Sequence, residues 1–184
     1  MSEKVLVRYE EQDKIAVLTL DDPPANTYTH EMMAQLDAAI VRARFADHIE
    51  VIVITGAGEK FFCAGANIGM LNEVTPGFKY CFCLHANETL NRLEHTPKLV
   101  IGALNGHTVG GGLEIAMAAD LRIARKGGGK VGLPEVALGV LPGTGGLTRL
   151  VDKRKVRRDL ADLFCTTAEG VKGKRAVRWR LVDG

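Results

Sequence analysis

Residues 105–116 read NGHTVGGGLEIA and place three consecutive glycines, Gly110, Gly111 and Gly112, where a predicted strand turns into a predicted helix. Because glycine has no Cβ, a polar atom of a ligand can approach the backbone closely at such a turn. The free N–H groups at the start of a helix also favour negative charge. Glu114 follows Gly111 by three residues and so lies on the same helix face. The stretch predicts either an oxyanion hole beside an acid or a close helix contact with a solvated acid.

Strands and helices alternate on both sides of this turn. Residues 5–10 and 15–20 predict a β-hairpin, and the apolar runs at 51–55, 99–103 and 121–124 predict further strands. We expect the strand at 51–55 to be buried on both faces of a parallel sheet. Helical spacing predicts helices from His30, capped by Thr29, to about residue 47, and over residues 78–94 and 113–119. With a loop at 61–67, this order predicts an α/β fold built from βαβ units.

A second acid, Glu135, follows Pro134 in an otherwise apolar stretch. Apolar surroundings raise the pKa of a carboxyl group, which suits proton transfer near neutral pH.

Beyond Pro142 the sequence changes to glycine-rich turns and basic helix. Residues 1–150 hold 14 basic against 17 acidic side chains, whereas residues 151–184 hold 10 against 5. We therefore place a soft boundary near residue 150 and interpret the basic segment as a solvated helical face or a surface for an anion or partner.

Composition excludes several classes of protein. The chain has 184 residues, 46% of them apolar, and a formal charge of +2, which is typical of a globular protein and not of a disordered chain or a dedicated nucleic-acid binder. Its four cysteines form no CxxC pair, its histidines have no common spacing for a metal site, and its start has no signal-peptide apolar core. No uncharged run reaches the roughly 18 residues that span a membrane. We expect a cytoplasmic protein with reduced thiols, no metal and no membrane partner.

The nucleotide-binding patterns are incomplete. TGAG at residues 55–58 follows a strand, but Phe61 stands where a dinucleotide fingerprint needs its third glycine. A phosphate loop of the GxxxxGK[ST] type is absent from the sequence. A nicotinamide-dependent oxidoreductase is therefore the least favoured function.

Three ordered motifs identify a family resemblance. FFCAGANI at 61–68, NGHTVGGGLEIA at 105–116 and LPEVALGVLPGTGG at 133–146 resemble the crotonase, or enoyl-CoA hydratase/isomerase, superfamily. The resemblance covers nearly the whole chain from residue 5. It implies a crotonase-like spiral of repeated ββα units, with its core over residues 1–150 and the start of a basic helical region over 151–184. It also implies an enzyme that binds an acyl-CoA thioester and stabilises its enolate, with coenzyme A as part of the substrate and no separate cofactor.

The resemblance also implies roles for individual residues. Glu114 and Glu135 resemble the two catalytic glutamates with which hydratases activate water across the α,β double bond. The backbone N–H groups of Ala66 and Gly111 resemble the two oxyanion-hole donors for the thioester oxygen. The remaining positions expected to contact substrate or CoA are Ala25, Ala64, Ala66, Ile68, Gly110 and Gly143. One departure is Asn67, which stands where an aspartate is more frequent and which predicts altered loop hydrogen bonding.

Two alternatives to an enoyl-CoA hydratase remain at this point. Residues 141–149, 157–166 and 169–173 resemble the benzoyl-CoA-dihydrodiol lyase branch, which opens a ring on a CoA thioester and also uses two glutamates. A non-catalytic acyl-CoA-binding subunit is the alternative of another class. The resemblance further implies trimers or dimers of trimers, completed by a C-terminal helical segment, so we expect that the chain is cut short and that its basic segment is normally covered.

Overall fold

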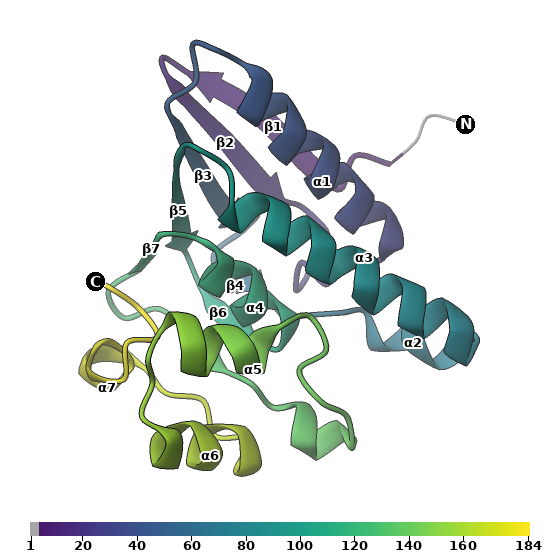
Figure 1. The fold of residues 1–184 in the computed structure, drawn as a ribbon, viewed down its shortest axis with the longest axis vertical. Coiled ribbons are helices and arrows are strands. Elements are labelled where there is room, and N and C mark those ends of the chain that lie inside the picture. Colours follow the sequence, from purple (N-terminus) through teal and green to yellow (C-terminus); the bar gives the residue numbers. More distant parts are fainter. Residues whose placement is uncertain (1–3) are drawn as a thin grey trace.

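The computed structural model describes residues 4–184 as two β-sheets surrounded by helices (Figure 1). The large sheet has the strand order β1-β2-β3-β5-β7, in which β1 and β2 form an antiparallel hairpin and the other neighbours run parallel. Its strands are β1 (Val7–Gln12), β2 (Ile15–Leu20), β3 (Val51–Gly56), β5 (Leu99–Leu104) and β7 (Leu121–Ala124). The predicted hairpin and the three predicted apolar strands are confirmed.

The central strand β3 is less buried than predicted. Ile52, Ile54 and Gly56 are buried, whereas Val51, Val53 and Thr55 are only partly buried. The expectation of burial on both faces is therefore wrong. Successive side chains point to opposite faces of a sheet, so this alternation means that one face packs more closely than the other.

Two long helices pack against each other and lie in front of the large sheet in Figure 1: α1 (His30–Phe45) and α3 (Pro76–Glu94). Thr29 caps α1 as predicted, because its hydroxyl accepts the N–H of Met32. α3 begins two residues before the prediction, with Pro76 in its first turn and Thr75 as its cap. α1 buries Met33, Leu36 and Ile40 completely, and each such side chain contributes about 1.5–3 kcal/mol to stability.

The small sheet consists of three short parallel strands in the order β4-β6-β8. Its strands are β4 (Phe61–Cys63), β6 (His107–Val109) and β8 (Val131–Gly132), and a short helix, α2 (Ile68–Glu73), follows β4. The predicted loop over residues 61–67 is wrong for residues 61–63, because a strand of this length shows no hydrophobic period. A glycine is required just before β6, since a Cβ on Gly106 would lie 2.4 Å from the carbonyl carbon of Lys60.

The remaining segments are turns and helices. The helix predicted over 113–119 and the turns and helix predicted beyond Pro142 are confirmed, whereas the short helix at residues 135–138 was not predicted. The buried helix α4 (Gly111–Ala118) follows β6, and η1 (Glu135–Leu138), α5 (Gly146–Thr148), η2 (Arg149–Lys153), α6 (Arg158–Thr166) and α7 (Gly173–Arg178) follow it. The final residues return to β7, where the N–H of Ala124 donates to the carbonyl of Gly184 at 2.7 Å and Asp183 pairs with the buried Arg122. η2 runs through residue 150, and the division of the chain at that point stays a prediction. Among residues 4–184, no helix has both the length and the apolar character that crossing a membrane requires.

Candidate active site

The turn between β6 and α4 leaves a backbone donor free. Gly110 caps α4 with a backbone φ of +56°, which residues other than glycine rarely adopt. The carbonyl of Gly110 accepts the N–H groups of Leu113 and Glu114. Within residues 4–184, the N–H of Gly111 donates no hydrogen bond. It therefore remains available to a ligand at the positive end of the helix.

A second free donor lies on the loop after β4. Tyr28 and Ala66 form a parallel bridge, in which the N–H of Tyr28 donates to Gly65 and the N–H of Asn67 donates to Tyr28, each at 2.9 Å. Because successive residues of an extended chain alternate, the intervening N–H of Ala66 points away from Tyr28 and finds no acceptor in the described chain. The two loops approach closely, since a Cβ on Gly65 would lie 2.9 Å from the nitrogen of Gly111. The predicted pair of amide donors is thus on adjoining loops.

Glu114 is held by the loop that follows η1. Its Oε1 accepts the N–H of Thr144 at 2.9 Å and the N–H of Gly146 at 2.7 Å. The side chain is buried, and burial raises the pKa of Glu114, although both backbone hydrogen bonds act in the opposite direction. Glu114 is therefore fixed in one orientation and is not solvated, which excludes the alternative of an exposed acid in the first helical turn.

Glu135 is the first residue of η1 and is also buried. The pKa of Glu135 is raised to about 7, chiefly by burial and in smaller part by the negative charge of Glu114. Its Oε1 lies 3.3 Å from the point where a Cβ on Gly110 would stand, so this carboxyl group adjoins the glycine turn. Its Oε2 is buried and has no hydrogen-bond partner within residues 4–184. The two predicted acids therefore lie within electrostatic reach of each other, next to the free amide of Gly111.

Sequence reasoning missed two further residues of the site: Tyr28, which lies against Gly111, and Thr144, whose N–H donates to Glu114. The Tyr28 hydroxyl is 3.3 Å from the Thr144 hydroxyl, and both side chains are buried. A Cβ on Gly111 would lie 2.2 Å from the Tyr28 oxygen, so the ring occupies the space that Gly111 leaves. Tyr28 and Thr144 are 116 positions apart in sequence. No spacing pattern could therefore have revealed this contact.

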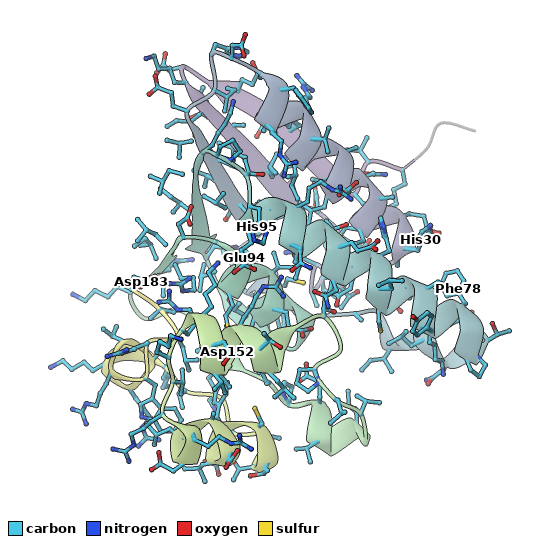
Figure 2. The ribbon with its side chains drawn as sticks, in the orientation of Figure 1. His30, Phe78, Glu94, His95, Asp152 and Asp183 are labelled. Atoms are coloured by element: carbon cyan, nitrogen blue, oxygen red, sulfur yellow. The ribbon has the colours of Figure 1, made fainter. Side chains whose placement is uncertain are left out.

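The loop that holds Glu114 is fastened by a buried arginine. Arg149 donates to the carbonyl of Thr144 at 2.8 Å, to Glu94 at 2.9 Å and to Asn91 at 2.8 Å. Glu94 also accepts from Lys153 at 2.9 Å and lies at the end of α3, beside the helix that carries Asp152 (Figure 2). The ion pairs lower the pKa of Glu94, against the effect of its partial burial. This network connects α3 to the backbone amides that position the Glu114 carboxylate.

The residues predicted to contact CoA come from several segments of the chain and differ in exposure. Ala25 and Ala64 are joined, because the N–H of Ala64 donates to the carbonyl of Ala25 at 3.0 Å. Ile68 opens α2 and is half exposed. Gly143 lies beside α3, where a Cβ on it would stand 3.4 Å from the sulfur of Cys83.

Asn67 has a defined structural effect. Its side-chain oxygen accepts the N–H of Met70 at 2.9 Å and caps α2, while its amide nitrogen donates to the Thr27 hydroxyl at 3.4 Å. The oxygen and the nitrogen of the Asn67 amide therefore both fix the loop between Ala66 and α2.

Among residues 4–184, no three His, Cys, Asp or Glu side chains are placed to bind a metal ion.

Comparison with known proteins places this site in context. The profile of the family described as Enoyl-CoA hydratase/isomerase matches residues 10–184. The chain is 49% identical to a benzoyl-CoA-dihydrodiol lyase of Aromatoleum evansii over 166 residues, which cover 86% of this chain and 30% of that one. It is 38% identical to a short-chain-enoyl-CoA hydratase of Clostridium acetobutylicum over 175 residues, which cover 95% of this chain and 66% of that one. The chain thus spans less than two thirds of the length of either relative.

Solved structures give the same fold. A crystal structure of an enoyl-CoA hydratase from Geobacillus kaustophilus HTA426 superposes with a TM-score of 0.94 at 41% identity, over 99% of this chain and 68% of that one. A structure of Pseudomonas aeruginosa DspI superposes with a TM-score of 0.92 at 32% identity. The predicted α/β fold of the crotonase type is confirmed.

Proposed function

Because the chain belongs to the enoyl-CoA hydratase/isomerase family, we propose that it adds water syn across the α,β double bond of a 2-enoyl-CoA thioester. One observation carries this proposal. Two buried carboxyl groups, Glu114 and Glu135, stand within electrostatic reach of each other beside the unpaired amide of Gly111. Hydration needs two groups that move protons and one place where negative charge is stabilised, and this arrangement offers both.

The amides of Ala66 and Gly111 take the thioester oxygen in this mechanism. Negative charge develops on that oxygen when water attacks the β-carbon, and fixed N–H donors stabilise it more than they stabilise the ground state. Removing one such donor typically costs about 3 kcal/mol of transition-state stabilisation. Both donors belong to the backbone, so they need no side-chain reorganisation during the reaction.

Glu114 and Glu135 divide the proton transfers. The two backbone N–H groups at Oε1 favour the charged form of Glu114, which accepts a proton from the attacking water. Glu135, whose pKa is about 7, is protonated in part of the molecules at neutral pH and delivers its proton to the α-carbon. The water oxygen bonds to the β-carbon as the double bond opens. A proton then passes from Glu114 to Glu135 to restore the starting state.

Hydration of crotonyl-CoA tests the assignment. We expect Glu135→Gln to lower kcat by about 10²–10⁴, the usual contribution of a positioned acid or base. Glu88→Gln is the matched control, because Glu88 is an exposed acid on α3 outside the site. Undiminished activity in the Glu135 variant would contradict the proposed roles.

A ring-opening lyase activity on a CoA thioester is the second candidate. It is favoured by the 49% identity to the benzoyl-CoA-dihydrodiol lyase, which exceeds the 38% identity to the short-chain hydratase. A dihydrodiol CoA thioester assayed in parallel with crotonyl-CoA separates the two. Faster turnover of the ring substrate would assign the chain to the lyase branch.

Acyl-CoA binding without turnover is the proposal of another class. Calorimetry with acyl-CoA substrates of several chain lengths distinguishes it, because binding without any hydration would favour a non-catalytic subunit. We also propose that the chain self-associates into trimers or dimers of trimers. Sedimentation at several protein concentrations measures that assembly, and a monomer at every concentration would contradict it.

A further inference from the structure

The amino ends of the small sheet gather positive charge. Lys60 directly precedes β4, His107 opens β6 and Lys130 directly precedes β8. Because all three strands run parallel, these residues lie at one edge of the sheet. The catalytic groups follow the same strands at the opposite edge. We call the first the amino edge and the second the carboxyl edge.

A cavity of about 430 Å³ opens at the amino edge. Its cations come from three separate segments and are Lys60, Arg125, Lys126, Lys130 and Lys172. Glu59 is the one acid among the described residues that line it, and it lies 3.6 Å from Arg125 in an exposed pair. Exposed pairs of this kind contribute little, so most of the positive charge in this amino-edge pocket is left without a partner.

The wall between these cations is bare backbone. The N–H of Gly128 donates to the carbonyl of Arg125 at 2.8 Å and closes a turn in which Gly127 has a φ of +71°. A Cβ on Gly129 would lie 2.3 Å from the nitrogen of His107, so this position admits only glycine. The glycines therefore let a ligand reach the backbone of the turn.

His107 offers Nε2 as a hydrogen-bond donor, because its Nδ1 is occupied as an acceptor. The N–H of Lys130 donates to Nδ1 of His107 at 3.2 Å, so the neutral ring carries its own hydrogen on Nε2. This contact also joins β6 to the residue before β8. The ring adds one donor to the five cations of the pocket.

We propose that the amino-edge pocket binds a small compound with two or more adjacent phosphate groups. Phosphate oxygens accept strong charge-assisted hydrogen bonds from lysine and arginine, and a compact polyanion relieves the mutual repulsion of the five cations. The cavity volume falls within the usual range for small-molecule sites. No Phe, Tyr or Trp is among the described lining residues, so recognition rests on charge and not on a stacked ring.

The pocket is separate from the catalytic groups. The intervening strands are two or three residues long, which places the two edges about 10 Å apart. Coenzyme A itself carries phosphates and is the other source of this chemistry, but its predicted contacts, Ala64 and Ile68, follow β4 at the carboxyl edge. We assign the pocket to a free phosphorylated compound. This assignment does not depend on the proposed hydratase function.

Calorimetry of the chain with sodium tripolyphosphate tests the proposal. We expect saturable binding at one site that weakens as NaCl is raised, because screening reduces attraction between solvent-exposed charges. The double variant Lys60→Ala/Lys130→Ala is expected to raise Kd at least tenfold, which corresponds to about 1.4 kcal/mol. Lys79→Ala on α3 removes the same charge from an exposed site elsewhere and is expected to leave Kd unchanged.

Two outcomes would overturn the proposal. One is an equal Kd for the wild type, the double variant and the Lys79 control, which would mean that the polyanion binds without a defined site. The other is loss of tripolyphosphate binding when the protein is saturated with CoA, which would assign the phosphates to the substrate. Equal melting temperatures of all variants without ligand establish that the comparison is made between folded proteins.

Discussion

The two edges of the small sheet differ in charge and in contact with water. At the carboxyl edge, Glu114 and Glu135 are buried, and burial raises the pKa of both. At the amino edge, Lys60, Lys126 and Lys130 are exposed. Desolvation therefore changes the proton affinity of the acids, whereas the solvated cations act by attracting counter-charge. The same three strands therefore carry buried acids suited to proton transfer at one edge and solvent-exposed cations suited to anion binding at the other.

The largest effect is expected at the carboxyl edge from Glu114→Gln. Glutamine keeps an oxygen that accepts the N–H groups of Thr144 and Gly146, but it cannot take a proton from water. We expect kcat for crotonyl-CoA to fall by about 10²–10⁴. The Lys60→Ala/Lys130→Ala variant, measured beside it, should keep kcat within about twofold. A comparable loss in that amino-edge variant would show that the two edges are not functionally separate.

Gly111→Ala is expected to have the next largest effect. The added Cβ would stand 2.2 Å from the Tyr28 oxygen and 2.5 Å from a ring carbon, so the ring must move. Overpacking of this kind costs about 1–3 kcal/mol of unfolding free energy, which urea denaturation measures. Gly77→Ala is the control, because the nearest atom to its added Cβ is 4.0 Å away.

A double-mutant cycle sharpens that prediction. In a Tyr28→Ala background the space above Gly111 is open, so Gly111→Ala should cost less than it does in the wild type. Fully additive losses would show that Tyr28 does not set the cost at Gly111.

Glu135→Gln should stabilise the chain above neutral pH. The pKa of Glu135 is raised from 4.5 to about 7 in the folded protein, so the folded state binds this proton more tightly than the unfolded state does. The wild type therefore loses stability as pH rises between about 4.5 and 7, and the full cost is present above that window. Because glutamine is neutral throughout, we expect a gain of about 2 kcal/mol at pH 8, or roughly 4–8 °C in Tm, and little change at pH 4.

The comparison across pH contains its own control. A stability gain of equal size at pH 4 and pH 8 would mean that packing, and not the charge of Glu135, causes it. The same titration predicts that hydration activity changes around pH 7, which a profile of kcat against pH measures.

The smallest effect is expected from Lys126→Ala at the amino edge. This side chain is exposed and forms no ion pair within residues 4–184. Its removal relieves repulsion between cations, so unfolding free energy should change by less than about 0.5 kcal/mol. Urea denaturation at low and at high salt measures the change, and a large loss would contradict the solvated character of this edge.

Local patterns in the sequence predicted the large sheet and its helices well. The hairpin, the apolar runs and the Thr29 cap all depend on neighbouring residues, and each is present in the structure. The strands of the small sheet escaped prediction, because two or three residues show no period. Their parallel pairing joins residues 61–63, 107–109 and 131–132, and only the folded chain aligns these segments.

By itself, the sequence determined the strands of the large sheet and the long helices between them, the glycine turn before Glu114, and the two acids that resemble catalytic glutamates. Those features rest on local spacing and on ordered motifs. The tertiary structure decided what surrounds them. It brings the N–H groups of Thr144 and Gly146, 30 and 32 positions away, to Glu114, and it packs Tyr28 against Gly111. It also gathers five cations around one pocket. Burial and pKa depend on such distant contacts, because they are set by which groups exclude water from a carboxyl and not by its neighbours along the chain.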